Sequence, residues 1–153
     1  MSRLLEDGDL PRQPQQKQFE LDGWIDTAPF EDLVGLKIES AAEGQAVLTV
    51  PFRLKLAMGG GYMHGGALTT LADTAVAMAI KSLLPPNTIF ATTELTTRFL
   101  APVRQGLVTA TARVSGPEGR TFFGEAGITD EAGVEVARFS SVFRVARGQG
   151  FDD

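Results

Sequence analysis

Two groups near the middle of the chain could do chemistry together: the glycine-rich run at residues 59–66 and the carboxylate of Asp73. The run, Gly-Gly-Gly-Tyr-Met-His-Gly-Gly, leads into an apolar stretch, so it can present backbone N–H groups to an anion or an oxyanion at the start of a helix. Asp73 stands inside that stretch, where an ionised carboxylate is costly to bury unless it is paired or used. Together they predict a site in which the Gly65 or Gly66 N–H polarises a carbonyl while Asp73 drives attack on it.

Each of these groups also has a structural interpretation. The glycines can serve only the conformation of a turn, since the run lacks the Gly-Lys-Ser/Thr of a phosphate loop and is not Gly-x-Ser-x-Gly. His64 can cap the helix or act as a hydrogen-bonded structural imidazole. Asp73 can lie on a solvated helix face with its threonine neighbours. We favour the structural role for His64 and a functional role for Asp73.

The spacing between the two groups restricts how they can cooperate. Gly65 and Asp73 are eight residues apart on one predicted helix, which places them about 12 Å apart along its axis. They therefore cannot both contact one reacting carbon within a single chain. Two antiparallel helices related by a twofold axis would place the start of each beside the middle of the other. The spacing thus predicts a site shared between two copies of the chain.

Composition excludes several classes of site. The 153 residues include no cysteine and one histidine, so thiolate nucleophiles, disulfides and bis-histidine metal sites are excluded, and a Ser-His-Asp triad could be built only around His64. The net charge of −5 argues against a nucleic-acid partner. No apolar run is long enough for a membrane span or a signal peptide. We expect a cytoplasmic protein that needs no metal and binds neither nucleic acid nor membrane.

The pattern along the chain predicts one α+β domain over residues 19–146, with a flexible N-terminal arm over 1–18 and a loose C-terminal tail over 147–153. A proline and a glycine bound a short helix at about 29–36, and Glu43-Gly44 joins two strands in a hairpin. The long helix is apolar nearly all round, which predicts burial, and Pro85-Pro86 stops it. Alternating residues then predict four strands in an antiparallel meander, giving a sheet curled over one helix. The expected ranges are 37–42 and 45–52 for the hairpin, 65–84 for the long helix, and 91–101, 107–114, 121–129 and 134–145 for the meander.

The helix motif resembles a known family. Residues 63–75, Met-His-Gly-Gly-Ala-Leu-Thr-Thr-Leu-Ala-Asp-Thr-Ala, resemble the His-Gly-Gly and Ala-Asp signature of hotdog-fold acyl-CoA thioesterases, in the phenylacetate-degradation (PaaI-like) branch of the 4-hydroxybenzoyl-CoA thioesterase superfamily. Residues 94–103 with Gly106 resemble the family's next strand and turn, and Gly119-Arg120 resembles its following hairpin. The resemblance implies a sheet wrapped around one long helix, subunits paired edge to edge, and a homotetramer built as a dimer of dimers.

The resemblance also implies an activity and roles for particular residues. The expected reaction is hydrolysis of an aryl- or medium-chain acyl-CoA thioester to free acid and CoA, with no cofactor besides the CoA of the substrate. Gly65, beside His64, would donate its N–H to the thioester oxygen, while the partner subunit's Asp73 acts as general base or nucleophile and Thr92 orients water. Two basic residues, Lys81 and Arg98, are interpreted as solvated surface charges. Substrate-binding residues are expected to be Met58, Gly59, Tyr62, Met63, Gly66, Leu68, Thr93, Gly119, Arg120 and Thr121.

One departure from the family pattern leaves alternatives open. Six residues before His64, where the branch often has an asparagine that helps to bind the thioester oxygen, this chain has Met58. The change is compatible with a slower thioesterase, with a compensating donor such as Tyr62, or with an apolar pocket in which Met58 packs against the substrate. A non-catalytic acyl-CoA-binding sensor remains an alternative. A hotdog enoyl-CoA hydratase or dehydratase is less favoured, because those relatives space their histidine and carboxylate differently.

Overall fold

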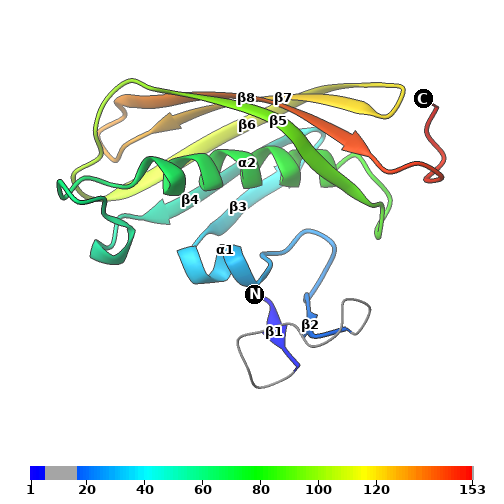
Figure 1. Ribbon diagram of the computed structural model, residues 1–153, viewed down its shortest axis with the longest axis horizontal. Helices are drawn as coiled ribbons and strands as arrows, with labels where there is room; N and C mark the ends of the chain where they lie inside the picture. Colours follow the sequence, from blue (N-terminus) through cyan, green and yellow to red (C-terminus); the bar gives the residue numbers. More distant parts are fainter. Residues whose placement is uncertain (6–16, 153) are drawn as a thin grey trace.

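One curled sheet and one long helix make up most of the molecule. The computed structural model describes residues 1–5 and 17–152. Six antiparallel strands lie in the order β3-β4-β6-β7-β8-β5 and cover the helix α2 (Gly65–Lys81) (Figure 1). The α+β class and the arrangement of sheet and helix are as the sequence predicts. The strands are β3 (Lys37–Ala42), β4 (Gln45–Pro51), β5 (Phe90–Phe99), β6 (Leu107–Glu118), β7 (Thr121–Thr129) and β8 (Glu135–Val145).

The long helix is buried on most sides but not on all of them. One narrow strip of α2, which we call the α2 strip and which comprises Thr70, Asp73, Ala77 and Lys81, is half-buried, because residues three and four apart share one helix face. The helix ends at Lys81, three residues earlier than predicted, since Ser82 caps it and Leu84 lies in the turn before the two prolines. Within the residues described, no helix is long and apolar enough to cross a membrane. The buried positions of α2 are Leu68, Leu71, Ala72, Thr74, Ala75, Val76, Met78, Ala79 and Ile80.

A glycine in β7 sets how close α2 lies to the sheet. A Cβ atom at Gly124 would stand only 2.2 Å from Cγ1 of Val76 and 2.9 Å from the Ser141 hydroxyl. No side chain fits there unless the helix moves away, because real Cβ contacts at such distances do not occur. The helix therefore rests almost directly on the backbone of β7.

The first hairpin and the short helix form where the sequence predicts them. Glu43 and Gly44 both have positive φ angles, 54° and 77°, which is the geometry of a two-residue hairpin turn. The helix α1 (Pro29–Val34) begins at a proline and ends at Gly35, which has a φ of 92° and caps the last turn. The chain thus enters β3 directly after α1, so α1 lies beside the sheet edge formed by β3 (Figure 1).

The predicted four-stranded meander is wrong in one pairing. Strands β6, β7 and β8 do follow one another, but β5 pairs with β8 and β6 pairs with β4. Alternation along a strand determines which face is buried and carries no information about which strand lies beside it. Residues 100–106, which include Pro102, cross the end of the sheet instead of forming a tight turn, and β5 becomes an edge strand.

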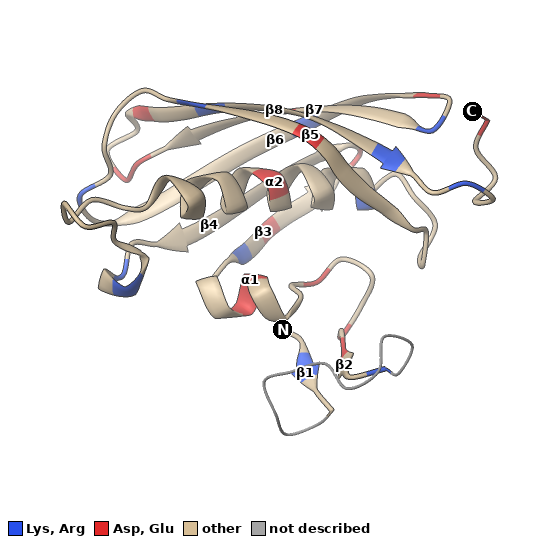
Figure 2. Ribbon diagram, in the orientation of Figure 1, with Lys and Arg blue, Asp and Glu red and all other residues tan. Residues whose placement is uncertain are grey.

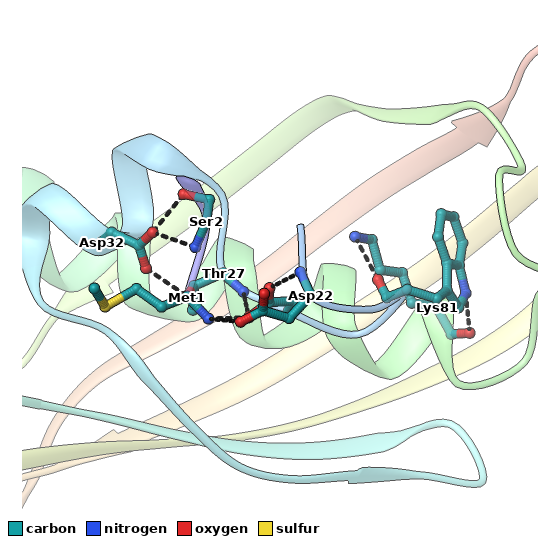
Figure 3. A network of polar contacts seen from close by, with 8 residues as sticks. Met1, Ser2, Asp22, Thr27, Asp32 and Lys81 are labelled. Atoms are coloured by element: carbon teal, nitrogen blue, oxygen red, sulfur yellow. Dashed lines mark hydrogen bonds and ion pairs between the residues drawn. The ribbon is translucent and has the colours of Figure 1, made fainter. Parts of the chain in front are cut away.

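The N-terminal residues pack against the segment that precedes α1. Strand β1 (Arg3–Leu4) pairs with β2 (Phe19–Glu20), and Ser2 donates from its backbone N–H to Asp32 Oδ2 at 2.8 Å (Figure 3). Asp32 also accepts a hydrogen bond from the Thr27 hydroxyl at 2.5 Å. Most of the arm predicted over residues 1–18 lies outside the described residues, which omit 6–16.

The C-terminal tail has no regular secondary structure but is held at two points. The Phe151 ring contacts the Phe122 ring edge to face, with 6.5 Å between centroids. The Gln149 side chain accepts a hydrogen bond from the backbone N–H of Ile89 at 3.1 Å. The tail, predicted to be loose, thus lies against the loop before β5 and against β7.

Candidate active site

A closed loop delivers the chain to the first turn of α2. After a single 3-10 turn (Leu54–Leu56), Ala57 and Met63 form an isolated antiparallel bridge. Inside that bridge the Met58 N–H donates to the Tyr62 carbonyl at 2.7 Å, and the Gly61 N–H donates to the Met58 carbonyl at 2.9 Å. Residues 58–62 therefore form a tight projection, and its glycine-rich composition fits the positive φ of 90° at Gly61.

His64 caps α2 and leaves one backbone donor free. Its Nδ1 accepts a hydrogen bond from the Gly66 N–H at 2.8 Å, so the favoured capping interpretation matches the geometry. The Gly66 N–H is thereby occupied. Among the described residues nothing accepts from the Gly65 N–H, which lies at the positive end of the helix dipole. Of the two glycines predicted as oxyanion donors, only Gly65 keeps its N–H available.

An aromatic ring lies against Gly65. A Cβ atom at Gly65 would come within 2.9 Å of Cζ of Phe99, the last residue of β5. Phe99 is 54% exposed, so its ring sits at the surface beside the first turn of α2. The glycine is therefore needed for close approach of this ring as well as for the helix start.

Asp73 and Thr92 meet inside one protomer. The Thr92 hydroxyl of β5 donates to Asp73 Oδ1 at 2.8 Å. Burial raises the pKa of Asp73; the hydrogen bond from Thr92 opposes this shift, and the negative charge of Glu31 in α1 adds to it. A carboxyl group with a raised pKa is a stronger base once ionised, which suits a group that must accept a proton.

No cation neutralises Asp73 among the residues that the structure describes. It is the single acidic residue of α2 and stands in the middle of the helix (Figure 2). A half-buried carboxylate without an ion pair is costly to desolvate, so its placement favours a chemical role.

The structure does not bring Gly65 and Asp73 together within one protomer. Both lie on α2, eight residues and about 12 Å apart along the axis. Thr92, by contrast, is brought to Asp73 although 19 residues separate them in the sequence. One protomer therefore supplies an acid with a hydroxyl partner at one place and an unused backbone donor at another.

Apart from Thr93, the predicted substrate-binding residues fall into three groups. Met63 and Leu68 are buried in the hydrophobic core, at 4% and 3% exposure, so the prediction that they contact substrate is not supported in the protomer. Their side chains fill space under the sheet, as apolar residues at these spacings commonly do. Met58, Gly59, Tyr62 and Gly66 are exposed in or beside the loop at the start of α2.

The third group lies away from this loop. Gly119, Arg120 and Thr121 form the turn between β6 and β7, at the end of the sheet where β8 meets Phe90. Arg120 is 7% exposed and donates to the Val145 carbonyl at 2.9 Å, so its guanidinium group is held inside the protomer, and its contact with substrate stays a prediction.

The remaining residues for which the sequence predicts a position or a role are Thr93, Lys81 and Arg98. Thr93 is the extra residue of a bulge in β5, and its hydroxyl donates to the Val142 carbonyl at 3.2 Å. Lys81, interpreted from sequence as a solvated charge, is half-buried, and its ammonium group donates to the Trp24 carbonyl at 3.0 Å. The surface interpretation is therefore wrong for Lys81, whereas Arg98 is exposed as expected.

An open depression of about 730 Å³ lies on the outer face of the sheet. Two of its arginines are paired with glutamates, Arg113 with Glu125 and Arg138 with Glu135. The sheet separates it from Asp73, since Arg98 and Thr96 alternate with the residues of β5 that face α2. We therefore place the candidate active site along α2 and not in this depression.

Sequence reasoning missed three residues near the site: Glu31, Phe99 and Trp24. The alternation of β5 could have placed Phe99 on the same face as Thr97, whose hydroxyl lies 2.9 Å from that of Thr69 in α2. Nothing in the sequence connects Glu31 or Trp24 to α2, because their contacts depend on how the N-terminal segment folds back.

Comparisons with known proteins agree with this fold and this helix. Residues 60–137 match a family described as the thioesterase superfamily. The 1,4-dihydroxy-2-naphthoyl-CoA hydrolase of Listeria monocytogenes is 33% identical over 102 residues, covering 67% of this chain and 83% of the relative.

Two solved structures extend the likeness. A conserved protein of Pseudomonas aeruginosa superposes with a TM-score of 0.75 at 29% identity, covering 78% of this chain and 95% of that one. The PaaI protein from the phenylacetic acid degradation operon of Escherichia coli gives a TM-score of 0.72 at 29% identity, covering 80% and 87%. By its sequence match and its fold, the chain belongs to the thioesterase superfamily, as a PaaI-like thioester hydrolase with the hotdog fold.

Proposed function

We propose that the protein hydrolyses an aryl- or medium-chain acyl-CoA thioester to the free acid and CoA, at a site shared by two protomers. The observation that carries this proposal is the separation on α2 between an unused backbone donor at Gly65 and an unpaired carboxylate at Asp73. The name of the Listeria relative, a hydrolase of an aryl-CoA ester, supports the substrate class.

The proposed reaction uses few groups. The Gly65 N–H of one protomer binds the thioester oxygen, and the partner subunit's Asp73 accepts a proton from water as the water oxygen attacks the carbonyl carbon. Negative charge on the carbonyl oxygen then collapses, the carbon–sulfur bond breaks, and CoA leaves as a thiolate that takes up the proton. Alternatively, the carboxylate attacks the carbonyl carbon and the carbon–sulfur bond breaks to release CoA as a thiolate; water then hydrolyses the resulting anhydride, which restores the carboxylate, frees the acid and supplies a proton to the thiolate. A thioester is sufficiently activated for either route to proceed without a metal.

Thr92 has a positioning role in this proposal. Its hydroxyl hydrogen is donated to Asp73 Oδ1, so the oxygen lone pairs of the hydroxyl remain available to a water molecule beside the carboxylate. The same hydrogen bond fixes the rotamer of the carboxylate, which leaves Oδ2 to accept the proton. His64 supports the site through the cap it forms on α2.

The exposed edge of the sheet supports the proposed dimer. Strand β5 is the last strand in the order, and Leu95 and Phe99 on it are 41% and 54% exposed. Apolar residues on an unpaired edge strand favour pairing with another chain. Antiparallel pairing of two β5 edges would bring the α2 strips together with each Gly65 near the partner's Asp73. A further pairing into a dimer of dimers is proposed from the family alone.

In this proposal, Met58 either lowers the rate of thioester hydrolysis or makes an apolar contact with the substrate. Its side chain is 43% exposed, and its sulfur accepts a hydrogen bond from the Gly60 N–H at 3.0 Å, so it cannot supply a donor to the oxyanion. The same feature favours the second candidate function, acyl-CoA binding without turnover. Gly65 is then the single donor that we assign to the oxyanion.

A complementation experiment tests the shared site. Asp73→Asn and Gly65→Pro each remove one half of the site, and Pro is tolerated at the first position of a helix. When the two inactive variants are mixed, unfolded and refolded together, half of the dimers are mixed and each holds one intact site of two. We expect thiol release at about one quarter of the wild-type rate.

The outcomes separate the candidate functions. Activity absent from the mixture but present in wild type would show that both groups act within one protomer, which contradicts the shared site. Tight acyl-CoA binding by wild type, with no thiol release from any ester, would favour the sensor. Hydration of an enoyl-CoA without CoA release would favour the hydratase.

A further inference from the structure

Trp24 and Lys81 hold each other by three contacts. The Trp24 indole N–H donates to the Lys81 carbonyl at 3.0 Å, and the Lys81 ammonium group donates to the Trp24 carbonyl at 3.0 Å. The ammonium nitrogen also lies 4.6 Å from the centroid of the indole ring. Two reciprocal hydrogen bonds and a cation–π contact fix both the backbone and the ring of Trp24 against the last turn of α2.

The other side of the indole contacts a row of aromatic rings. Trp24 meets Phe90 in an edge arrangement, with centroids 6.5 Å apart and an interplanar angle of 68°. Phe90 in turn lies 5.9 Å from the ring of Phe143. The indole is thus held between α2 and the first residue of β5, and it closes the space between these two elements at that end.

This closure lies a short distance beyond the candidate active site on both elements. On β5, Phe90 is two residues before Thr92, whose hydroxyl binds Asp73. On α2, Lys81 is eight residues after Asp73, or about 12 Å along the axis. Because β5 runs antiparallel to α2, both elements lead from the carboxylate to the same indole ring.

The surface of α2 between Asp73 and Lys81, which we call the Ala77 interval, is the part of the α2 strip that leads from the carboxylate toward the indole. Toward the core the space is filled, since Ala72 and Val76 are fully buried. Within the α2 strip, Ala77 is the one residue between Asp73 and Lys81, and it is half-buried with only a methyl group.

The far side of the Ala77 interval is bordered by α1. Burial lowers the pKa of Lys81, and the charges of Glu31 and Asp26 act against that shift. The negative charge of Glu31 also adds to the raised pKa of Asp73. The interval therefore has an apolar end at the indole and a charged side at α1.

We propose that Trp24 limits the length of the acyl group: the acyl chain extends from the reacting carbonyl along the Ala77 interval and ends against the indole ring. This inference rests on the proposed thioesterase function and adds a specificity residue to it. A flat ring or a short chain fits within the interval without reaching the indole. A longer chain meets the ring, which its contacts with Lys81 and Phe90 prevent from turning aside.

Trp24 is the only tryptophan of the chain, so its fluorescence reports directly on the proposed contact. Unreactive thioether analogues of acyl-CoA, from butyl to dodecyl, are titrated into the wild-type protein, with CoA alone as the reference. We expect short analogues to leave the emission unchanged and analogues beyond a certain length to shift it. The length at which the shift begins should equal the length at which kcat/KM for the matching thioesters starts to fall.

Variants then test the limit itself. Trp24→Ala should raise kcat/KM for the first excluded chain length by about tenfold while leaving butanoyl-CoA unchanged, in the range that one methylene in an apolar pocket is worth. Trp24→Phe should give an intermediate limit. Lys81→Met, which keeps the stem but removes the ammonium group, loosens the ring and serves if Trp24→Ala does not fold. Phe123→Ala, an exposed ring on β7, is the matched control.

Two results would overturn the proposal while leaving the thioesterase function intact. One is a folded Trp24→Ala protein with the wild-type chain-length profile. The other is an equal loss for every chain length, which would indicate a purely structural ring. Absence of thiol release from every ester by the wild-type protein would instead reject the proposed function.

Discussion

At its first turn α2 offers a free backbone N–H beside an exposed loop, whereas its last turn is bound by Trp24, whose ring contacts Phe90. The first end therefore presents dipoles, which act on charge wherever a carbonyl is placed near them. The last turn presents a steric boundary, because its polar groups already bind one another. Asp73 lies between these two turns and takes part in the contacts of neither. Under the two proposals, each α2 would stabilise the transition state of one site at its first turn and limit the acyl group of the other site at its last turn.

The largest effect that tests this division is expected from the acid. Asp73→Asn keeps a side chain that can accept the Thr92 hydrogen bond but cannot take a proton, so thiol release should fall by about 10³-fold with the fold and assembly unchanged.

His64→Ala, at the first turn, should cost about 1 kcal/mol of stability through the lost cap and affect turnover far less. Steady-state kinetics with circular dichroism and sedimentation measure both. Wild-type turnover in Asp73→Asn would remove the acid from the mechanism.

A smaller effect is expected at the first turn. Gly65→Pro removes the N–H, and His64 already has the extended backbone, with φ −63° and ψ 131°, that a residue before proline requires. Gly65→Ala adds a Cβ at the same place against Phe99 but keeps the N–H, so it is the matched control. The proline variant should be slower than the alanine variant by about 10²-fold in kcat, as for loss of one oxyanion donor. Equal rates would assign the whole effect to crowding of Phe99.

The smallest effect is expected from Glu31 of α1, a residue that lies outside both ends of α2. Glu31→Gln removes a negative charge that raises the pKa of Asp73, so that pKa should fall. Since the base acts when ionised, the acidic limb of the kcat/KM profile should move to lower pH by less than about one unit, while the rate on the plateau changes little. A limb that stays in place would show that Glu31 does not act on the ionising group.

Local patterns explain why part of the molecule could be predicted from sequence. The turn at Glu43 and Gly44, the start of α2 after His64 and the faces of the strands all depend on neighbours within a few residues. The separation of Gly65 from Asp73 could be predicted as well, because helix geometry fixes it. The shared site follows from that spacing alone, and it stays a prediction.

The remaining features depend on contacts between distant segments. Alternation in β5 gives its faces but not its place beside β8, so the meander was predicted with one wrong pairing. From its sequence Lys81 is predicted to be a surface charge, because its contact with Trp24, 57 residues earlier, depends on the tertiary fold. Met63 and Leu68 belong to an apolar stretch in which core and pocket positions have the same residue types, and only their burial separates the two.

The bare backbone at Gly124 has a consequence for how this enzyme can vary. Because Val76 touches the sheet where no side chain intervenes, the height of the helix above β7 is a fixed dimension of the scaffold. Asp73 lies less than one turn from Val76 and inherits that dimension. Any side chain introduced at position 124 would therefore push the helix away from β7 and shift the acid relative to Thr92.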